Sequence, residues 1–224
     1  MTARCERATV RRCAFLILIF ATIAIAAPVS HAQQFPPENE FGVWGAYSAN
    51  SPDVWGSQGH IQFGVAALRY GRLVAVSPRY TVEYTADVEP VEVARADVYT
   101  SCKILLHGKV QPGFCPIGKQ WIYGGGVSPF GWKFNLRPKH QWQPFGALSA
   151  GFVMSERAIP DDIPKATRFN FTFDFQLGVE RFNRKRTRAW TFSYKLQHIS
   201  NAFRSSVNPG VDLNMIAIGY SFFK

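Results

Sequence analysis

Three side chains near the C-terminal end of the chain are of the types that acyl transfer needs. They are His198, Ser200 and Asp212. A serine hydroxyl becomes a good nucleophile when an adjacent imidazole removes its proton, and a carboxylate orients that imidazole and stabilises its charge. Asn201, next to the serine, adds an amide donor for the developing oxyanion. The spacing predicts a Ser-His-Asp catalytic arrangement with Asn201 as the oxyanion contributor.

The same residues have a second interpretation. His, Ser and Asn are common in turns, and Asn208-Pro209-Gly210 is a typical turn sequence. A polar hairpin rim that does no chemistry would contain these residue types as well. Composition and spacing alone leave both interpretations open.

The elements that would position these residues are β-strands. Strict alternation of apolar and polar residues is typical of strands with two different faces. The clearest alternation runs over 169–180, where Phe, Leu and Val interleave with Asn, Thr, Asp, Gln and Glu. Further alternating stretches lie at 74–85, 190–197 and 216–222, and weaker ones at 41–49, 59–70, 120–136 and 141–155. The pattern therefore predicts eight strands.

Strand periodicity places the three candidate residues on one face. Residues two apart in a strand point to the same side. His198 and Ser200 therefore share the face of the aromatic residues in 190–196, and Asp212 shares that of the apolar residues in 216–222. Because adjacent strands lie ~4.8 Å apart, we expect Asp212 to reach His198 across the hairpin.

Strand alternation alone does not distinguish a soluble sandwich from a membrane barrel. The expected strands are mostly longer than the ~5–6 residues usual in soluble proteins. The connections alternate between long ones, at 50–58, 90–119, 156–166 and 201–210, and short ones, near 71–72, 137–140 and 183–188. Outer-membrane barrels have this asymmetry. We therefore expect an all-β fold, an eight-stranded antiparallel transmembrane β-barrel with its apolar face toward lipid. Ionisable residues are costly on a lipid-facing surface, so their presence there suggests a functional site.

The first 32 residues have the three parts of a secretory signal peptide. Four arginines form a basic start, an apolar stretch runs from Cys13 to Ala27, and Ser30-His31-Ala32 supplies a cleavage site. A retained anchor is the alternative, but the apolar stretch is short for a ~20-residue spanning helix. We expect a signal peptide at 1–32 and one barrel domain at 33–224 with long extracellular loops. Removal of the signal lowers the formal charge from +10 to +7.

The mature chain keeps two cysteines. In an exported protein Cys102 and Cys115 most simply form one disulfide. The remaining histidines lack ligand spacing, so no metal site is expected. The basic charge comes without a nucleic-acid-binding motif, and export argues against a nucleic-acid partner.

A family resemblance becomes visible at the candidate residues. The pattern His198-Ile199-Ser200-Asn201-Ala202, followed by Asn208-Pro209-Gly210 and an acidic residue at 212, resembles the outer-membrane lipid A deacylases of the PagL type, also grouped as acyloxyacyl hydrolase-like barrels. The resemblance implies a barrel that removes an ester-linked acyl chain from lipid A of lipopolysaccharide without a cofactor. His198 would be the base, Ser200 the nucleophile, Asn201 an oxyanion contributor and Asp212 the acidic member, where the best-known form has Glu.

Two functional hypotheses follow. The first is an outer-membrane serine esterase, a carboxylic ester hydrolase acting on lipid A in the outer leaflet. The second is a non-catalytic barrel with a structural or adhesive role, in which 90–119 is the working part. This insert is longer than the resemblance leads us to expect. The sequence leaves open which acyl position is cleaved and whether the barrel forms a homodimer.

A basic run occupies one of the expected short connections. Arg181, Arg184, Lys185, Arg186 and Arg188 would lie in a periplasmic turn. Such a turn either contacts anionic head groups of the inner leaflet or is simply solvated.

Overall fold

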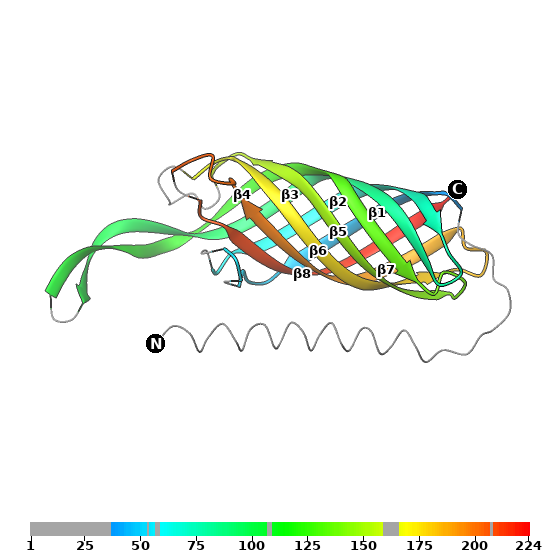
Figure 1. Ribbon diagram of the computed structural model, residues 1–224. Coiled ribbons are helices and arrows are strands. Elements are labelled where there is room, and N and C mark those ends of the chain that lie inside the picture. Colours follow the sequence, from blue (N-terminus) through cyan, green and yellow to red (C-terminus); the bar gives the residue numbers. More distant parts are fainter. Residues whose placement is uncertain (1–36, 53, 57–58, 107–108, 159–165, 207) are drawn as a thin grey trace, which may run out of the picture. The chain divides into compact units, whose positions relative to one another are not determined.

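The computed structural model describes residues 37–52, 54–56, 59–106, 109–158, 166–206 and 208–224. Within them eight antiparallel strands close into a barrel in sequence order, which confirms the predicted fold (Figure 1). The strands are β1 (Asn39–Ser48), β2 (Gln62–Val76), β3 (Tyr80–Leu106), β4 (Lys109–Leu136), β5 (Trp142–Ser155), β6 (Phe169–Phe182), β7 (Arg188–Ser200) and β8 (Val211–Phe223). The signal peptide expected at 1–32 lies outside the described residues.

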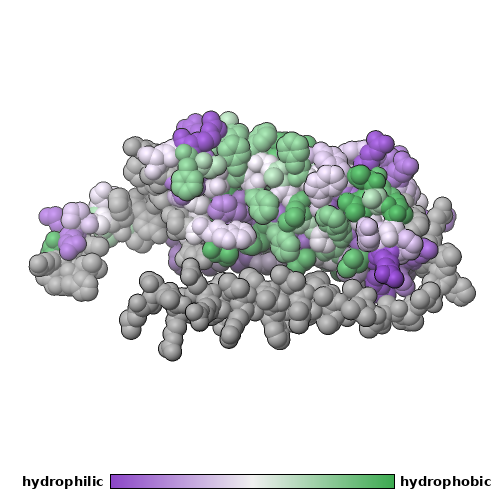
Figure 2. Space-filling view, viewed as in Figure 1, coloured by the Kyte–Doolittle hydropathy of each residue, from purple (hydrophilic) through white to green (hydrophobic). Residues whose placement is uncertain are grey.

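The alternation of side chains is reversed relative to a soluble barrel. In β6, Phe171 and Phe173 are 40% and 47% exposed, whereas Asn170, Thr172 and Asp174 are buried. Figure 2 shows apolar residues gathered over the middle of the barrel and hydrophilic residues toward its ends. The apolar face therefore points outward, as a lipid-facing wall requires.

Buried charges are paired inside the barrel. The Lys133 ammonium is fully buried and contacts the carboxylates of Glu40, Glu83 and Glu180, the last two at 2.7 and 3.1 Å. Charges removed from water are tolerated when opposite charges and hydrogen bonds replace their hydration. The interior of this part of the barrel is thus a packed ionic network.

Near the end of β7 and the start of β8 the interior of the barrel is apolar instead. Ile199 of β7 and Val211, Leu213 and Met215 of β8 point inward and are at most 2% exposed. They pack in one cluster with inward residues of the neighbouring strands, such as Phe63. The interior here is therefore not polar, and an apolar core supports the strand ends that carry the candidate site.

The turn expected at 71–72 is wrong. β2 continues through Gly71 to Val76, and the connection to β3 is Ser77–Arg79. Gly71 faces the interior, where a Cβ atom would lie 2.2 Å from Glu83 Oε1 and 3.0 Å from Glu40 Cβ. This glycine marks a close approach of interior side chains within a strand rather than a turn.

The connection expected at 90–119 is a continuation of the strands. β3 pairs with β2 only as far as Arg95, and β4 pairs with β5 only from Gly124, whereas β3 and β4 pair with each other out to Leu106 and Lys109. The two strands thus leave the barrel as a hairpin (Figure 1). Cys102 and Cys115 are joined by a disulfide across it. Its prolines do not interrupt it, because one side of each strand needs no partner in a two-stranded ribbon.

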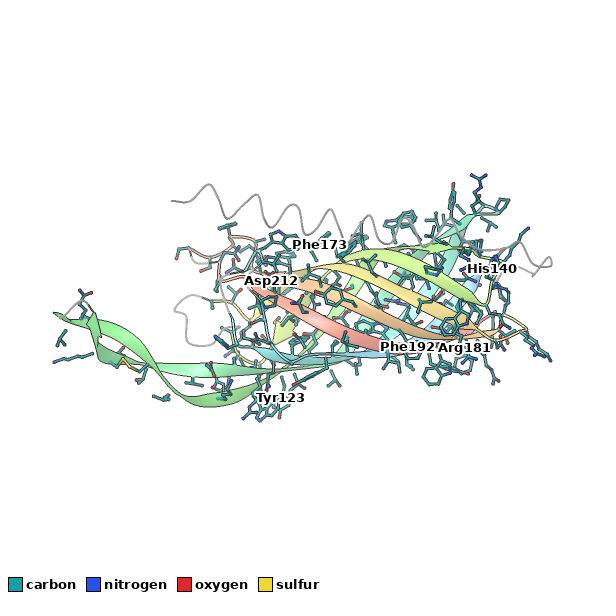
Figure 3. The ribbon with its side chains drawn as sticks, turned by 90° about the horizontal axis from the view of Figure 1, so that it is seen from below. Tyr123, His140, Phe173, Arg181, Phe192 and Asp212 are labelled. Atoms are coloured by element: carbon teal, nitrogen blue, oxygen red, sulfur yellow. A yellow bond between two sulfur atoms is a disulfide. The ribbon has the colours of Figure 1, made fainter. Side chains whose placement is uncertain are left out.

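The two ends of the barrel differ. The connections 49–61, 156–168 and 201–210 lie at the same end as the hairpin, and the shorter ones at 77–79, 137–141 and 183–187 lie at the opposite end. Figure 3 shows Asp212 and Phe173 toward the first end and His140 and Arg181 toward the second. No helix among the described residues is long and apolar enough to cross a membrane.

Candidate active site

His198 and Asp212 face each other across the last hairpin. They are direct partners in the pairing of β7 with β8, as strand periodicity predicts. His198 Nδ1 lies 2.6 Å from Asp212 Oδ1. An ionised carboxylate only accepts hydrogen bonds, so Nδ1 carries the proton, and in the neutral imidazole Nε2 is then the acceptor. The pair thus has the orientation that a general base and its orienting carboxylate need.

The second oxygen of Asp212 is held by the β1–β2 connection. The backbone N–H groups of Val54 and Gly56 donate to Oδ2 at 2.9 and 2.7 Å, and that of Trp55 donates to the same oxygen. The Asp212 side chain is fully buried as a result, whereas that of His198 is 23% exposed. Three amide donors favour the ionised carboxylate and fix its orientation.

Two glycines allow this connection to close over the site. A Cβ atom on Gly56 would lie 2.2 Å from the carbonyl oxygen of Gly210, and one on Gly210 would lie 2.8 Å from His198 Cε1. The backbone at 54–56 therefore packs directly on the Asn208-Pro209-Gly210 turn. The Trp55 ring stands edge-on to the His198 ring, with the centroids 6.2 Å apart.

Ser200 lies two residues beyond His198 on the same outward face. It is half-buried and pairs across the sheet with Phe171, while His198 pairs with Phe173. Residues two apart in a strand are separated by about 6.6 Å, so the serine hydroxyl and the imidazole occupy neighbouring positions. The structure thus places all three predicted residues at one end of one outward face.

Asn201 follows Ser200 at the end of β7. It is 1% exposed, and its backbone N–H donates to Asn208 Oδ1 at 3.0 Å. Ala202 and Phe203 then adopt left-handed backbone conformations, with φ of 50° and 59°. The connection turns sharply here and leaves Phe203 83% exposed beside the site.

One polar residue near the site, Asn214, is not part of the sequence motif. Asn214 lies two residues past Asp212 on the same face of β8, and the Tyr194 hydroxyl donates to its side-chain oxygen. The Asn214 amide group keeps two N–H donors on the apolar wall below the His198–Asp212 pair. Strand parity with Asp212 is the signal that could have found it.

The chain was compared with known proteins. A family model described as "Lipid A 3-O-deacylase (PagL)" matches residues 100–221, which is more than half of the chain and includes His198, Ser200, Asn201 and Asp212. The chain belongs to the PagL family. It is therefore an outer-membrane barrel of a hydrolase family, the lipid A 3-O-deacylases, and the resemblance seen in the sequence is confirmed.

Several solved structures are similar to this PagL-family chain. The crystal structure of the outer-membrane enzyme PagL has a TM-score of 0.50 at 11% identity, covering 81% of this chain and 98% of that one. Neisserial surface protein A has a TM-score of 0.44 at 8% identity, covering 82% and 96%. OprG from Pseudomonas aeruginosa has a TM-score of 0.44 at 11% identity, covering 87% and 100%. The chain matches none of the curated proteins.

Proposed function

We propose that this PagL-family barrel hydrolyses the ester-linked acyl chain at position 3 of lipid A, with Ser200 as nucleophile, His198 as base and Asp212 as the orienting carboxylate. The observation that carries the proposal is the 2.6 Å contact between His198 Nδ1 and Asp212 Oδ1 on the outward wall. It commits Nε2 of the imidazole to accept a proton. Lipid A in the outer leaflet would present its ester to this wall without leaving the membrane.

The first chemical step forms an acyl-enzyme. His198 Nε2 takes the proton of Ser200 Oγ as that oxygen attacks the ester carbonyl carbon. The resulting oxyanion collapses, the bond to the sugar oxygen breaks, and the protonated imidazole gives its proton to that oxygen. The deacylated sugar hydroxyl leaves, and the acyl chain stays on Ser200.

Water completes the cycle. His198 Nε2 removes a proton from a water molecule, whose oxygen attacks the acyl-enzyme carbonyl, and the returned proton releases Ser200 and the free fatty acid. Asp212 stays ionised throughout and stabilises the imidazolium that forms twice. We propose Asn201 as an oxyanion contributor, for which its buried amide must turn toward the face of Ser200 when substrate binds.

The expected export signal belongs to the same proposal. Lipid A faces the cell exterior, so the site end of the barrel would lie outside and the short turns would face the periplasm. We infer that residues 1–32 are removed during export and that residues 33–224 form the barrel domain.

Labelling with a serine-reactive phosphonate tests the nucleophile. The purified barrel in detergent is treated with a long-chain alkyl fluorophosphonate, and peptide mass spectrometry locates the adduct. We expect one adduct on Ser200, no adduct in His198→Ala, and normal labelling in Ser206→Ala, which removes an exposed serine of the same connection. Labelling of another residue, or equal labelling of His198→Ala, would contradict the proposal.

A further inference from the structure

A hollow of about 520 Å³ opens on the outer wall at the short-turn end of the barrel. Its lining includes the side chains of Arg181, Arg184 and Arg188, together with Trp190 and Tyr220. This volume falls in the range of small-ligand sites, roughly 300–1,000 Å³. No acidic residue is among the described residues that line it.

Arg181 lies at the level of an aromatic row, and Arg184 and Arg188 lie in or next to the turn that follows it. Arg181 pairs across the sheet with Trp142 on one side and Trp190 on the other, and Trp190 pairs with Tyr220. The Arg181 guanidinium lies 5.4 Å from the centre of the Trp142 ring. Aromatic girdles mark the depth of the lipid head groups in outer-membrane barrels. The positive charges are therefore placed where phosphates of the membrane lie.

The turn that carries Arg184 is well built. The Asn183 side-chain oxygen accepts the backbone N–H groups of Thr187 and Arg188, and the Asn183 N–H donates to the Arg188 carbonyl. Arg186 is turned inward, where its guanidinium donates to the His140 carbonyl. The basic run thus separates into an inward residue that supports the turn and outward residues that line the hollow.

An apolar groove continues from the hollow toward the middle of the membrane. It also measures about 520 Å³ and shares Trp190 and Tyr220 with the hollow. Gly45, Ala66 and Ile218 line it further along β1, β2 and β8. Gly45, which has no side chain, and the small Ala66 leave room on a wall that is otherwise covered by large apolar groups. A cationic hollow that passes into an apolar groove matches a head group with its acyl chain, not a free anion.

We propose that this surface binds one anionic phospholipid, with its phosphodiester between the three arginines and an acyl chain in the groove. Arg181, which lines the hollow, lies at the end of the barrel opposite to Asp212 (Figure 3). That this surface faces the inner leaflet rests on the orientation given by the proposed function; the lipid binding itself does not. Lipids without a compensating amine, such as phosphatidylglycerol, leave a net charge for the guanidiniums, whereas phosphatidylethanolamine carries its own cation.

Native mass spectrometry of the folded barrel in detergent tests this site, with phosphatidylglycerol as the probe. Arg181→Gln/Arg188→Gln should bind this lipid about thirtyfold more weakly than the wild type. Each basic residue at a membrane surface strengthens lipid binding by a similar factor, and this variant lacks two of them. Arg72→Gln/Arg79→Gln is the matched control, because it removes two exposed charges at the same end but outside the hollow. The control should bind within about twofold of the wild type.

Two further measurements distinguish a specific lipid site from non-specific attraction of an anionic lipid to a basic surface. Ala66→Phe keeps an apolar residue on the wall but fills the groove, so it should weaken phosphatidylglycerol binding while the charge is unchanged. Phosphatidylethanolamine should bind more weakly than phosphatidylglycerol to the wild type. Equal losses in the two double variants, unchanged binding by Ala66→Phe, or equal affinity for the two lipids would overturn the proposal. The experiment measures lipid binding and not deacylation. Failure of the proposed enzymatic function would therefore not affect this result, and failure of lipid binding would not affect the proposed enzymatic function.

Discussion

His198 and Asp212 are directly opposed on β7 and β8, with Nδ1 and Oδ1 2.6 Å apart, on the outward face of a membrane barrel. An ionisable pair on this face is costly unless its partners are fixed. Here the remaining carboxylate oxygen is held by three backbone N–H groups from residues 54–56. The same contacts make the carboxylate a rigid support for the imidazole.

Asp212→Asn tests the role of the carboxylate. The amide is nearly the same size but cannot hold the imidazole in the required tautomer or stabilise its positive charge. We expect kcat on lipid A micelles to fall by up to about four orders of magnitude, as loss of the acidic member does in serine hydrolases. Asp212→Glu should keep part of the activity, because it retains a carboxylate. The rest should be lost, because the added methylene displaces that carboxylate from the donors at 54–56. Near-normal kcat in Asp212→Asn would contradict the assigned role.

Gly56→Ala tests whether the contact of the 54–56 backbone with Asp212 supports catalysis. The added methyl group would lie 2.2 Å from the Gly210 carbonyl oxygen, so the 54–56 backbone must move away from the carboxylate. We expect kcat to fall roughly tenfold to a hundredfold, since hydrogen bonds to a charged group contribute about 1.5–3 kcal/mol each. The measurement is the initial rate of fatty-acid release from lipid A micelles.

Gly118→Ala is the matched control for this change. A Cβ atom on Gly118 would have nothing within 4 Å, so the rate should be unchanged. Both variants should migrate as folded barrels in unheated electrophoresis. Equal rates for the two variants would show that the 54–56 contact does not support catalysis.

Lys133→Met tests the ionic network inside the barrel. The substitution leaves Glu40, Glu83 and Glu180 without their buried cation. We expect the free energy of unfolding to fall by about 3–5 kcal/mol, because removing one partner leaves uncompensated buried charge. Urea unfolding in lipid vesicles, followed by tryptophan fluorescence, measures the change.

Lys119→Met is its control. Lys119 pairs with Asp97 at 3.0 Å on the hairpin, with both side chains partly exposed. An exposed ion pair contributes about 1 kcal/mol or less. Equal effects of the two substitutions would refute the view that Lys133 stabilises the interior.

Removal of the hairpin distinguishes the enzyme from an adhesive barrel. Ala96 and Gln120 are paired across β3 and β4, so a short turn can join them once 97–119 is deleted. The pairs that close the barrel lie outside the deleted segment, and we expect a folded barrel that still deacylates lipid A. A folded variant without activity would show that the hairpin belongs to the enzymatic site.

Most of the barrel was predictable from the sequence because period-two alternation is a local signal. The stretch 169–180 alone indicates which side chains face lipid, and the same parity places His198 opposite Asp212. Gly71 was misread as a turn, because a glycine in a turn and a glycine beneath a crowded interior side chain look alike in sequence. The 90–119 segment was misread as a connection, whereas it continues β3 and β4 as a free ribbon that tolerates its prolines.

The contacts of residues 54–56 with Asp212 were not predictable. More than 150 positions separate the two, and amide donors carry no side-chain signature. The inward apolar cluster around Leu213 was missed for a different reason. Alternation identifies two faces, but at this end of the barrel the inward face is apolar and the outward face carries the polar residues of the candidate site.

Mass spectrometry of lipid A from cells that express the wild type, Ser200→Ala or Ser206→Ala tests the central claim most directly. We expect the wild type and Ser206→Ala to remove one ester-linked acyl chain from position 3, and Ser200→Ala to leave lipid A intact, with all three proteins folded in the outer membrane. Identical lipid A from the wild type and a folded Ser200→Ala variant would contradict the account.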